Sequence, residues 1–372
     1  MNFQSNENGA GVRAFRSCLL VWYDAHAREL PWRRDKDPYR VWVSEIMLQQ
    51  TRVAAVIEHY HEFLRRFPTV QKLAKAREAR VLAAWSGLGY YRRARMLHAA
   101  ARIVVRDGRF PTTAPGWREL PGIGRYTAAA IASIAFDEPV AVVDGNVERV
   151  LRRASGKRMA GEDLWRVAEE LLDRGRPGDF NQAVMELGAT VCTPRAPACL
   201  TCPVVELCAT RGEMKSTTNL PRQKKREIDY ALDLRDGAVF LVQRARDARL
   251  MAGMWELPEI ALGDKSPSIT ALKRCATPKQ VPPTLSPHAR LRTGRNDKSI
   301  ESGMPLFTVK HSITVTNYTV RVWKQAVPRG VRGEWVAVER LTKLPLTGLA
   351  RKILRKAALL GESKLRKRSA KI

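Results

Sequence analysis

Apolar residues recur at three- and four-residue spacing from residue 13 to about residue 212, and no convincing alternation with a period of two interrupts them. This spacing is typical of amphipathic helices, so the segment is predicted to be helical almost throughout. In the stretch 41–67 one helical face continues until Pro68 ends it. Further helices are predicted at Glu78–Trp85, Arg92–Asp107, Arg125–Phe136, 147–153, 161–174 and 180–190. Residues 1–212 are therefore expected to form a mainly α domain.

The pattern changes after residue 212. Residues 213–229 are polar and basic, as expected of a linker. Residues 230–245 alternate apolar and polar around Asp236 and Gly237, which predicts a β-hairpin, and strand-like runs return at 312–323 and 333–341. Residues 263–305 are rich in Pro, Ser, Lys and Arg and are predicted to be a mobile insertion. A second, α+β domain is expected at 230–358, followed by a basic tail at 359–372.

The charge of the chain indicates its class of partner. Lys and Arg outnumber Asp and Glu by 65 to 37, a net charge of +28. Such an excess favours a polyanionic partner, first of all nucleic acid, although an Arg-rich source genome is an alternative. No apolar run approaches the roughly 20 residues that span a bilayer, and the N-terminus lacks a basic segment followed by an apolar one. We therefore expect no membrane association and a cytoplasmic protein, near the nucleoid if the source is bacterial.

Four cysteines with the spacing C-x6-C-x2-C-x5-C lie close together near the end of the first domain: Cys192, Cys199, Cys202 and Cys208. In a reducing compartment such a cluster favours a metal over disulfides. Two separate C-x2-C pairs are typical of a structural zinc site, whereas this run has one such pair flanked by longer gaps, as iron–sulfur proteins do. An iron–sulfur cluster is the preferred interpretation, and zinc stays open.

Residues 119–133 place Gly122 and Gly124 at a tight turn before a helix of small residues. Without side chains there, the backbone can approach a phosphate, and the N–H groups that open the next helix point toward it. The pattern predicts a helix-hairpin-helix element that binds DNA. Simple close packing of two helices is the alternative.

Two carboxylates have the settings of catalytic groups. Glu45 has apolar neighbours in the sequence, and burial would raise its pKa enough to make it a proton donor near neutral pH. An exposed Glu on the polar face of a helix is the alternative. Asp144 follows an apolar run and precedes a helix, where it serves as an N-cap whether or not it also acts in catalysis.

Together these motifs resemble a known superfamily. The Glu45 helix with Gln49–Thr51, residues 87–95, the glycine hairpin, residues 143–151 and the four cysteines occur in the order of the endonuclease III superfamily. More closely, the chain resembles adenine DNA glycosylases of the MutY type, densely over about 14–208 and loosely beyond. The resemblance implies a monomer that binds double-stranded DNA, excises adenine opposite 8-oxoguanine or guanine, and holds one 4Fe-4S cluster on the four cysteines.

The resemblance also implies roles for single residues. Glu45 would protonate adenine at N7, and Asp144 would stabilise the cationic sugar, as paired carboxylates do in glycoside hydrolysis. Tyr126 would lie beside them, at the position where endonuclease III has the Lys that gives strand cleavage, so a monofunctional enzyme is expected. The residues implied around adenine and at the lesion are Trp32, Arg33, Leu48, Gln182, Gln50 and Tyr90, the last wedged into the base stack. Core packing is the alternative for the aromatic side chains.

The second domain resembles the Nudix-like module of the same family, best at residues 241–260. It lacks the acidic R-E-x-x-E-E helix that binds magnesium in Nudix hydrolases, so recognition of the opposite strand is its expected task. The usual Phe-Ser-His loop aligns with Ile313, Thr314 and Val315. Thr314 still offers a hydroxyl, whereas Val315 offers no hydrogen bond. His311 or Asn317 in a shifted loop is the alternative.

Three functions compete for this sequence: an adenine glycosylase, a bifunctional glycosylase and lyase for pyrimidine lesions, and a non-catalytic iron–sulfur protein that binds DNA. Tyr126 and the appended domain count against the second, because the Lys nucleophile is missing. Glu45 and Asp144 together count against the third. Adenine excision is therefore the predicted function.

Overall fold

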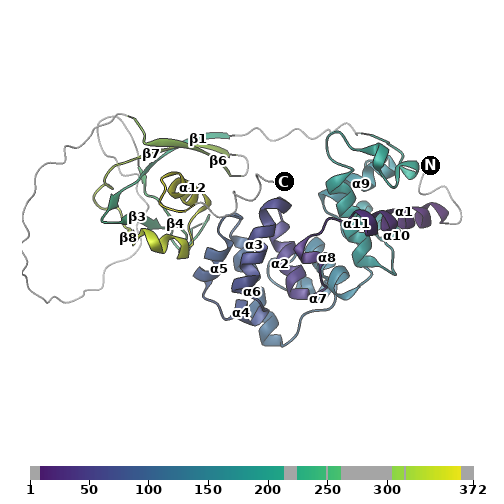
Figure 1. Ribbon diagram of the computed structural model, residues 1–372. Coiled ribbons are helices and arrows are strands. Elements are labelled where there is room, and N and C mark those ends of the chain that lie inside the picture. Colours follow the sequence, from purple (N-terminus) through teal and green to yellow (C-terminus); the bar gives the residue numbers. More distant parts are fainter. Residues whose placement is uncertain (1–8, 213–223, 249, 261–303, 314–315, 362–372) are drawn as a thin grey trace, which may run out of the picture.

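The computed structural model describes residues 9–212, 224–248, 250–260, 304–313 and 316–361 of the 372-residue chain. Figure 1 shows two bodies, one built of helices and one built mainly of strands. The expected insertion, apart from its last two residues, and most of the basic tail lie outside the described residues, as do Thr314 and Val315. Among the described residues no helix is both long enough and apolar enough to cross a membrane.

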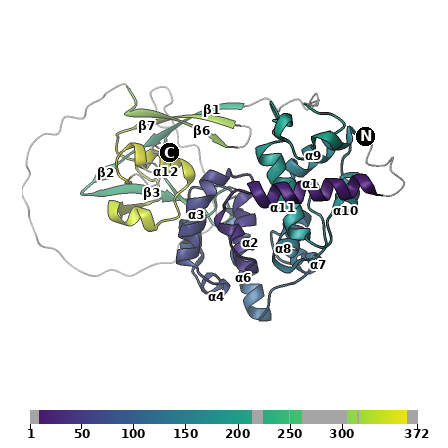
Figure 2. The same ribbon diagram turned by 45° about the vertical axis from the view of Figure 1, so that its right-hand side comes forward.

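The helical body confirms the prediction of a mainly α first domain. Its apolar faces meet in one core around Trp42, Trp85 and Trp117, each of which is fully buried. Figure 2 shows α1 lying alongside α10 and α11 at one end of this body. The helices are α1 (Ala10–His26), α2 (Pro38–Leu48), α3 (Val53–Arg66), α4 (Val70–Ala74), α5 (Glu78–Trp85), α6 (Arg92–Asp107), α7 (Ala114–Arg118), α8 (Arg125–Phe136), α9 (Gly145–Ser155), α10 (Glu162–Leu171) and α11 (Pro177–Thr190), with 3-10 turns η1 (Pro31–Arg33), η2 (Cys199–Thr201) and η3 (Val205–Leu207).

The single helix predicted over 41–67 is wrong, because the chain breaks between α2 and α3. Asp37 caps α2 through the N–H of Arg40, and the helix ends at Leu48. Gln50 then takes a left-handed conformation with φ 55°, and α3 begins at Val53. Four residues separate the two helices, which is close to the 3.6 residues of one helical turn. The spacing of apolar residues along the sequence therefore stays in phase across the break. Spacing alone therefore did not reveal it.

The second body contains two sheets and a short helix. In the first sheet the order is β5-β1-β7-β6, with β1 and β7 parallel, and in the second β3 pairs with β2, β4 and β8. The α12 side chains Leu349, Ile353 and Leu354 are buried in the core of this body. The elements are β1 (Lys224–Ala231), β2 (Leu234–Arg235), β3 (Ala238–Gln243), β4 (Trp255–Glu256), β5 (Glu259–Ile260), β6 (Phe307–Ile313), β7 (Thr316–Trp323), β8 (Glu334–Ala337), η4 (Val338–Lys343) and α12 (Gly348–Lys356).

Two predictions for this body meet different outcomes. The hairpin around Asp236 and Gly237 is confirmed, since both residues have positive φ and join the antiparallel strands β2 and β3. The linker predicted over 213–229 is too long, because β1 already begins at Lys224. The charged residues that open β1 are exposed, and they pair along β7 through their backbone, so their polar side chains gave no strand signal.

The two bodies lie against each other. In Figure 1 the second body lies beside α3 and α5, and η4 contacts α5. Met254, which directly precedes β4, is fully buried in the core cluster of the helical body. The second body is therefore anchored to the first by an apolar side chain as well as by polar contacts.

Candidate active site

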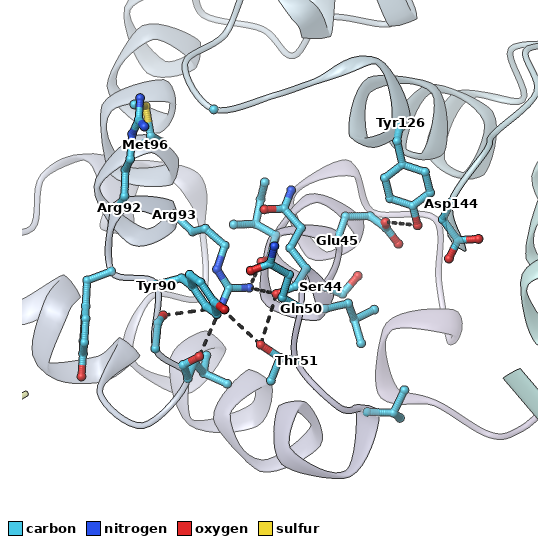
Figure 3. A pocket seen from close by; sticks show the side chains of 18 of the residues that line it. Ser44, Glu45, Gln50, Thr51, Tyr90, Arg92, Arg93, Met96, Tyr126 and Asp144 are labelled. Carbon is cyan, nitrogen blue, oxygen red and sulfur yellow. Dashed lines mark hydrogen bonds between the residues drawn. The ribbon is translucent and has the colours of Figure 1, made fainter. Parts of the chain in front are cut away.

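A cavity of about 1360 Å³ opens between the helices of the first body and one edge of the second. Its walls come from α2, α6, α11, the ends of α8 and α9, and the loops after α2 and α5. Figure 3 shows the contributions of α2, α6, α8 and the start of α9. The structure brings most of the predicted site residues to this one cavity: Trp32, Arg33, Glu45, Leu48, Gln50, Tyr90, Gly122, Tyr126, Asp144 and Gln182 all line it. Gly124 is not among the lining residues.

Glu45 is the buried acid of the cavity. Its side chain lies on α2 and is only 6% exposed, which excludes the alternative of a solvated helix face. The Tyr126 hydroxyl donates to Glu45 Oε2 at 3.0 Å and lies 3.2 Å from the sulfur of Met185. Burial raises the pKa of Glu45 to about 7, with the Tyr126 hydrogen bond opposing and the negative charge of Asp144 reinforcing that rise. The carboxyl group is therefore suited to hold a proton at neutral pH and to release it.

Asp144 faces the same space from the start of α9 (Figure 3). Its Oδ1 accepts from the N–H groups of Asn146 at 2.8 Å and Val147 at 2.7 Å, and its Oδ2 accepts from the Asn146 amide at 3.0 Å. The helix cap predicted for this residue is present. Because three donors hold the carboxylate, its negative charge has a fixed place at the cavity wall.

Ion pairs around the buried carboxylate of Glu186 form another part of the wall. Arg33 donates to Gln182 at 3.2 Å and to Glu186 at 2.9 Å, and Arg28 also pairs with Glu186, which is 1% exposed. Burial raises the pKa of Glu186, but the two guanidinium groups outweigh this and hold it below its usual value. Trp32 is 7% exposed and packs edge-on against Tyr60, so it serves both the core and the cavity.

Arg93, on α6, ties two loops of the cavity to α2. One terminal nitrogen donates to the carbonyls of Ile46, Met47 and Gln49, and the other to Thr51 Oγ1 and to the carbonyls of Leu88 and Gly89. The guanidinium also lies over the Tyr90 ring, 5.4 Å from its centre. Burial lowers the Arg93 pKa to about 10, so the group stays cationic at neutral pH. Gln50 and Tyr90, which both have positive φ, are thereby held by a common cation.

Sequence reasoning missed Glu186 and Arg93. A single acid on the buried side of the small-residue helix α11 was a possible signal for Glu186, because such a group needs a cationic partner. Arg93 gave no signal at all, since it stands among other arginines at 92–95 and its partners are mostly backbone carbonyls.

The predicted glycine hairpin lies between α7 and α8. Gly122 has φ 81°, and a Cβ atom there would lie 2.5 Å from the Met96 Cβ, so both conformation and packing require glycine. Gly124 is the N-cap of α8 and has an ordinary negative φ, and a Cβ atom there would meet nothing within 4 Å. Internal packing and backbone conformation thus explain the first glycine, and neither of them requires glycine at the second.

The four predicted cysteines are all unpaired and partly buried. The thiol of Cys202 interacts electrostatically with Cys192, Cys199 and Cys208, so the four sulfurs share one region. Arg153, on α9, is 5% exposed and holds the loop through the carbonyls of Thr193 and Pro194. Among the described residues no set of three or more His, Cys, Asp or Glu side chains is arranged to hold a metal ion.

The second body closes one side of the cavity. His311 and Ser312 on β6, Gly348 on α12 and Leu250 line it. Burial, then the positive charge of Lys352, lowers the pKa of His311, which favours the neutral form of its ring. The hydroxyl of Ser312 pairs with the Asn317 side chain at 2.7 Å. Thr314, the residue first expected to face the DNA, lies outside the described residues.

Comparison with known proteins agrees with both domains. Residues 43–172 match the model of the HhH-GPD superfamily of base excision DNA repair proteins, and residues 230–356 match that of the NUDIX domain. The solved structure of a thermostable thymine-DNA glycosylase superposes with a TM-score of 0.52 at 31% identity, over 55% of this chain and 99% of that one. The predicted architecture, a helix-hairpin-helix glycosylase domain followed by a Nudix-like domain, is confirmed.

Curated relatives from several organisms carry the name adenine DNA glycosylase, among them those of a mammal and of a yeast. That of Mus musculus is 42% identical over 318 residues, covering 68% of this chain and 62% of the relative. The chain thus spans less than two thirds of the mouse protein. That of Schizosaccharomyces pombe is 34% identical over 327 residues, covering 68% of this chain and 71% of the relative. With this degree of likeness and coverage, the chain belongs to the family of adenine DNA glycosylases.

Proposed function

We propose that the protein is a DNA glycosylase that removes adenine mispaired with 8-oxoguanine or guanine from double-stranded DNA and leaves the strand intact. The observation that carries this proposal is the pair Glu45 and Asp144, a protonatable carboxyl and an anchored carboxylate on the walls of one cavity. A base inside the duplex is inaccessible, so the nucleotide must leave the stack to reach such a cavity.

The chemistry divides between the two acids. Glu45 gives its proton to N7 of adenine, and the bond between C1′ and N9 breaks with its electron pair going to the base. Asp144 stabilises the positive charge that develops on the sugar, as a carboxylate does in glycoside hydrolysis. Water then bonds to C1′, and its proton leaves through a carboxylate. The Tyr126 hydroxyl holds Glu45 in place and has no amine with which to attack the sugar, which supports hydrolysis without strand cleavage.

The 4Fe-4S cluster is part of the proposal, with Cys192, Cys199, Cys202 and Cys208 as its ligands. Thiols are the usual ligands of such clusters, and the four share one loop that Arg153 fixes. Nothing in the proposed reaction passes through the cluster. It would order the loop that carries Arg195.

Product analysis tests the function. Purified protein is incubated with duplexes that carry adenine opposite 8-oxoguanine, adenine opposite guanine, or thymine opposite guanine. Free adenine together with an alkali-labile, uncleaved strand is the expected result. Release of thymine instead would assign the activity for which the superposed thymine-DNA glycosylase is named, and strand cleavage without alkali would point to a lyase. Binding without release of any base would leave only a DNA-binding role.

The second domain is proposed to read the base opposite adenine, with His311 and Ser312 as the polar side chains that it contributes to the cavity lining. A neutral imidazole can donate to one edge of 8-oxoguanine and accept from another group. We expect His311→Ala to lower the preference for 8-oxoguanine over guanine by about two- to tenfold, the scale of one hydrogen bond. Thr314→Ala should lower it less. The reverse ranking in paired single-turnover assays would return the role to Thr314.

A further inference from the structure

Two buried hydroxyl groups of the first body converge on one carbonyl of the second. The side chains of Ser86 and Tyr91 both donate to the carbonyl oxygen of Leu346 at 3.0 Å. Ser86 is 3% exposed, Tyr91 is 4% exposed and Leu346 is fully buried. Water is therefore kept from all three groups, and separating the bodies would leave each of them without these bonds. Such contacts favour one fixed arrangement of the two bodies.

The accepting carbonyl has a fixed position within its own body. The backbone N–H of Trp255, on β4, donates to the carbonyl of Pro345 at 2.9 Å. The backbone carbonyl of Trp255 accepts from the N–H of Thr347 at 2.9 Å. Gly348 follows and opens α12, and a Cβ atom there would lie 4.0 Å from Cε1 of His311. Leu346 is thus two residues from the element that packs beside the proposed reader of the opposite base.

The two donating residues flank the loop that carries Tyr90, on the other side of the cavity. Ser86 and Tyr91 bound the loop that contains Tyr90, which has φ 47° and is 48% exposed. Arg93 fixes the same loop to the end of α2, the helix that bears Glu45 (Figure 3). The loop is therefore held from one side by the catalytic helix and from the other by the second body. A second contact supports the docking, because Arg95 donates to the carbonyl of Ala252.

We propose that Ser86 and Tyr91 are positioning residues through which the second domain and the Tyr90 loop are held at a fixed spacing, so that discrimination of the opposite base depends on them. Both hydroxyls are engaged by the Leu346 carbonyl. Their contribution is the distance between His311, on one wall of the cavity, and Tyr90, on another. This inference rests on the proposed function for its kinetic test, and on the structure alone for its physical test.

The kinetic test compares Ser86→Ala, Tyr91→Phe and the double variant with Tyr39→Phe. Tyr39 is the matched control, since its hydroxyl also donates to a backbone carbonyl, that of Phe67 at 2.8 Å, within the first body. Single-turnover excision rates are measured with 8-oxoguanine and with guanine opposite adenine. Each single variant should lower the ratio of the two rates by about two- to tenfold, and the double variant by more. Tyr39→Phe should lower thermal stability and leave the ratio unchanged.

An unchanged ratio in the double variant, with a stability loss like that of Tyr39→Phe, would reduce the two hydroxyls to structural contacts and overturn the proposal. Amide hydrogen exchange of residues 86–91 in the full-length free protein supplies the physical test. At least tenfold faster exchange in the double variant, but not in Tyr39→Phe, supports the docking, and equal exchange overturns it. If wild-type protein releases no adenine from either duplex, the proposed function fails, and exchange alone decides the docking.

Discussion

At the scale of single residues, the burial that gives Glu45 its raised pKa also lowers the stability of the folded protein at higher pH. Its pKa is about 7 in the folded protein and 4.5 ordinarily, so the folded state binds the extra proton between these values. The contribution of this proton to the free energy of unfolding is fully present below about pH 4.5. It is lost as the pH rises to about 7, by on the order of 3 kcal/mol. Glu45→Gln should therefore unfold at higher denaturant concentration than wild type at pH 8, with the difference vanishing near pH 4. Equal midpoints at pH 8 would contradict the raised pKa.

The same residue predicts a pH dependence of the reaction. Excision needs the protonated acid, so the single-turnover rate should fall about tenfold per pH unit above about 7. Glu45→Gln should lose roughly 100- to 10,000-fold in rate while it still binds DNA. Rapid release of adenine by this variant would remove Glu45 from the role of acid.

Asp144 allows its two roles to be separated. Asp144→Asn keeps a good helix cap, whereas Asp144→Ala loses it at a cost of about 1 kcal/mol. Both variants lack the negative charge, so both should lose excision, and chemical denaturation should find only Asp144→Ala destabilised. A fully active Asp144→Asn would leave only the capping role.

At the scale of elements, Arg93 joins α2 to the loops on either side of the cavity. Arg93→Met leaves several buried carbonyls without a donor and should lower the free energy of unfolding by about 1–3 kcal/mol, measured by denaturation. Arg92→Met is the matched control, because Arg92 is exposed and a surface substitution of this kind stays within about 0.5 kcal/mol. Equal losses would mean that the hydrogen bonds of Arg93 contribute nothing.

The elements also show what the sequence could and could not predict. The sequence pattern placed α5, α6 and α8 at their observed bounds. In α6 the buried residues recur on one face, whereas α8 is buried on every side from Thr127 to Ile134. The spacing of apolar residues wrongly joined α2 to α3, because the four residues between the helices keep this spacing in phase. It also missed β1, because the first residues of that strand are charged and exposed. The two carboxylates that we propose to be catalytic, Glu45 and Asp144, could be found from their neighbours in the sequence. Arg93 could not be found in this way, and for Glu186 only its place on the buried side of α11 gave a signal, because the partners of both residues are distant in the chain.

At the scale of the whole molecule, the charge of +28 predicts how binding responds to salt. Each DNA phosphate that the protein neutralises should add about −0.9 to the slope of log affinity against log salt concentration. Removing residues 359–372 should make the slope shallower if those basic residues contact phosphate. Titrations of labelled duplex at several salt concentrations measure the slope, and an unchanged value would mean that the tail is merely solvated.

The docking carbonyl of Leu346 has a consequence for mutational scans. A backbone oxygen accompanies whatever side chain stands at that position, so replacing Leu346 by alanine removes packing but leaves both hydrogen bonds available. An alanine scan of the second domain would therefore miss the attachment point and record only a loss of core volume. Among side-chain substitutions, only those at Ser86 and Tyr91 in the first domain would remove these hydrogen bonds. Such substitutions would look like defects of a glycosylase domain that is otherwise intact.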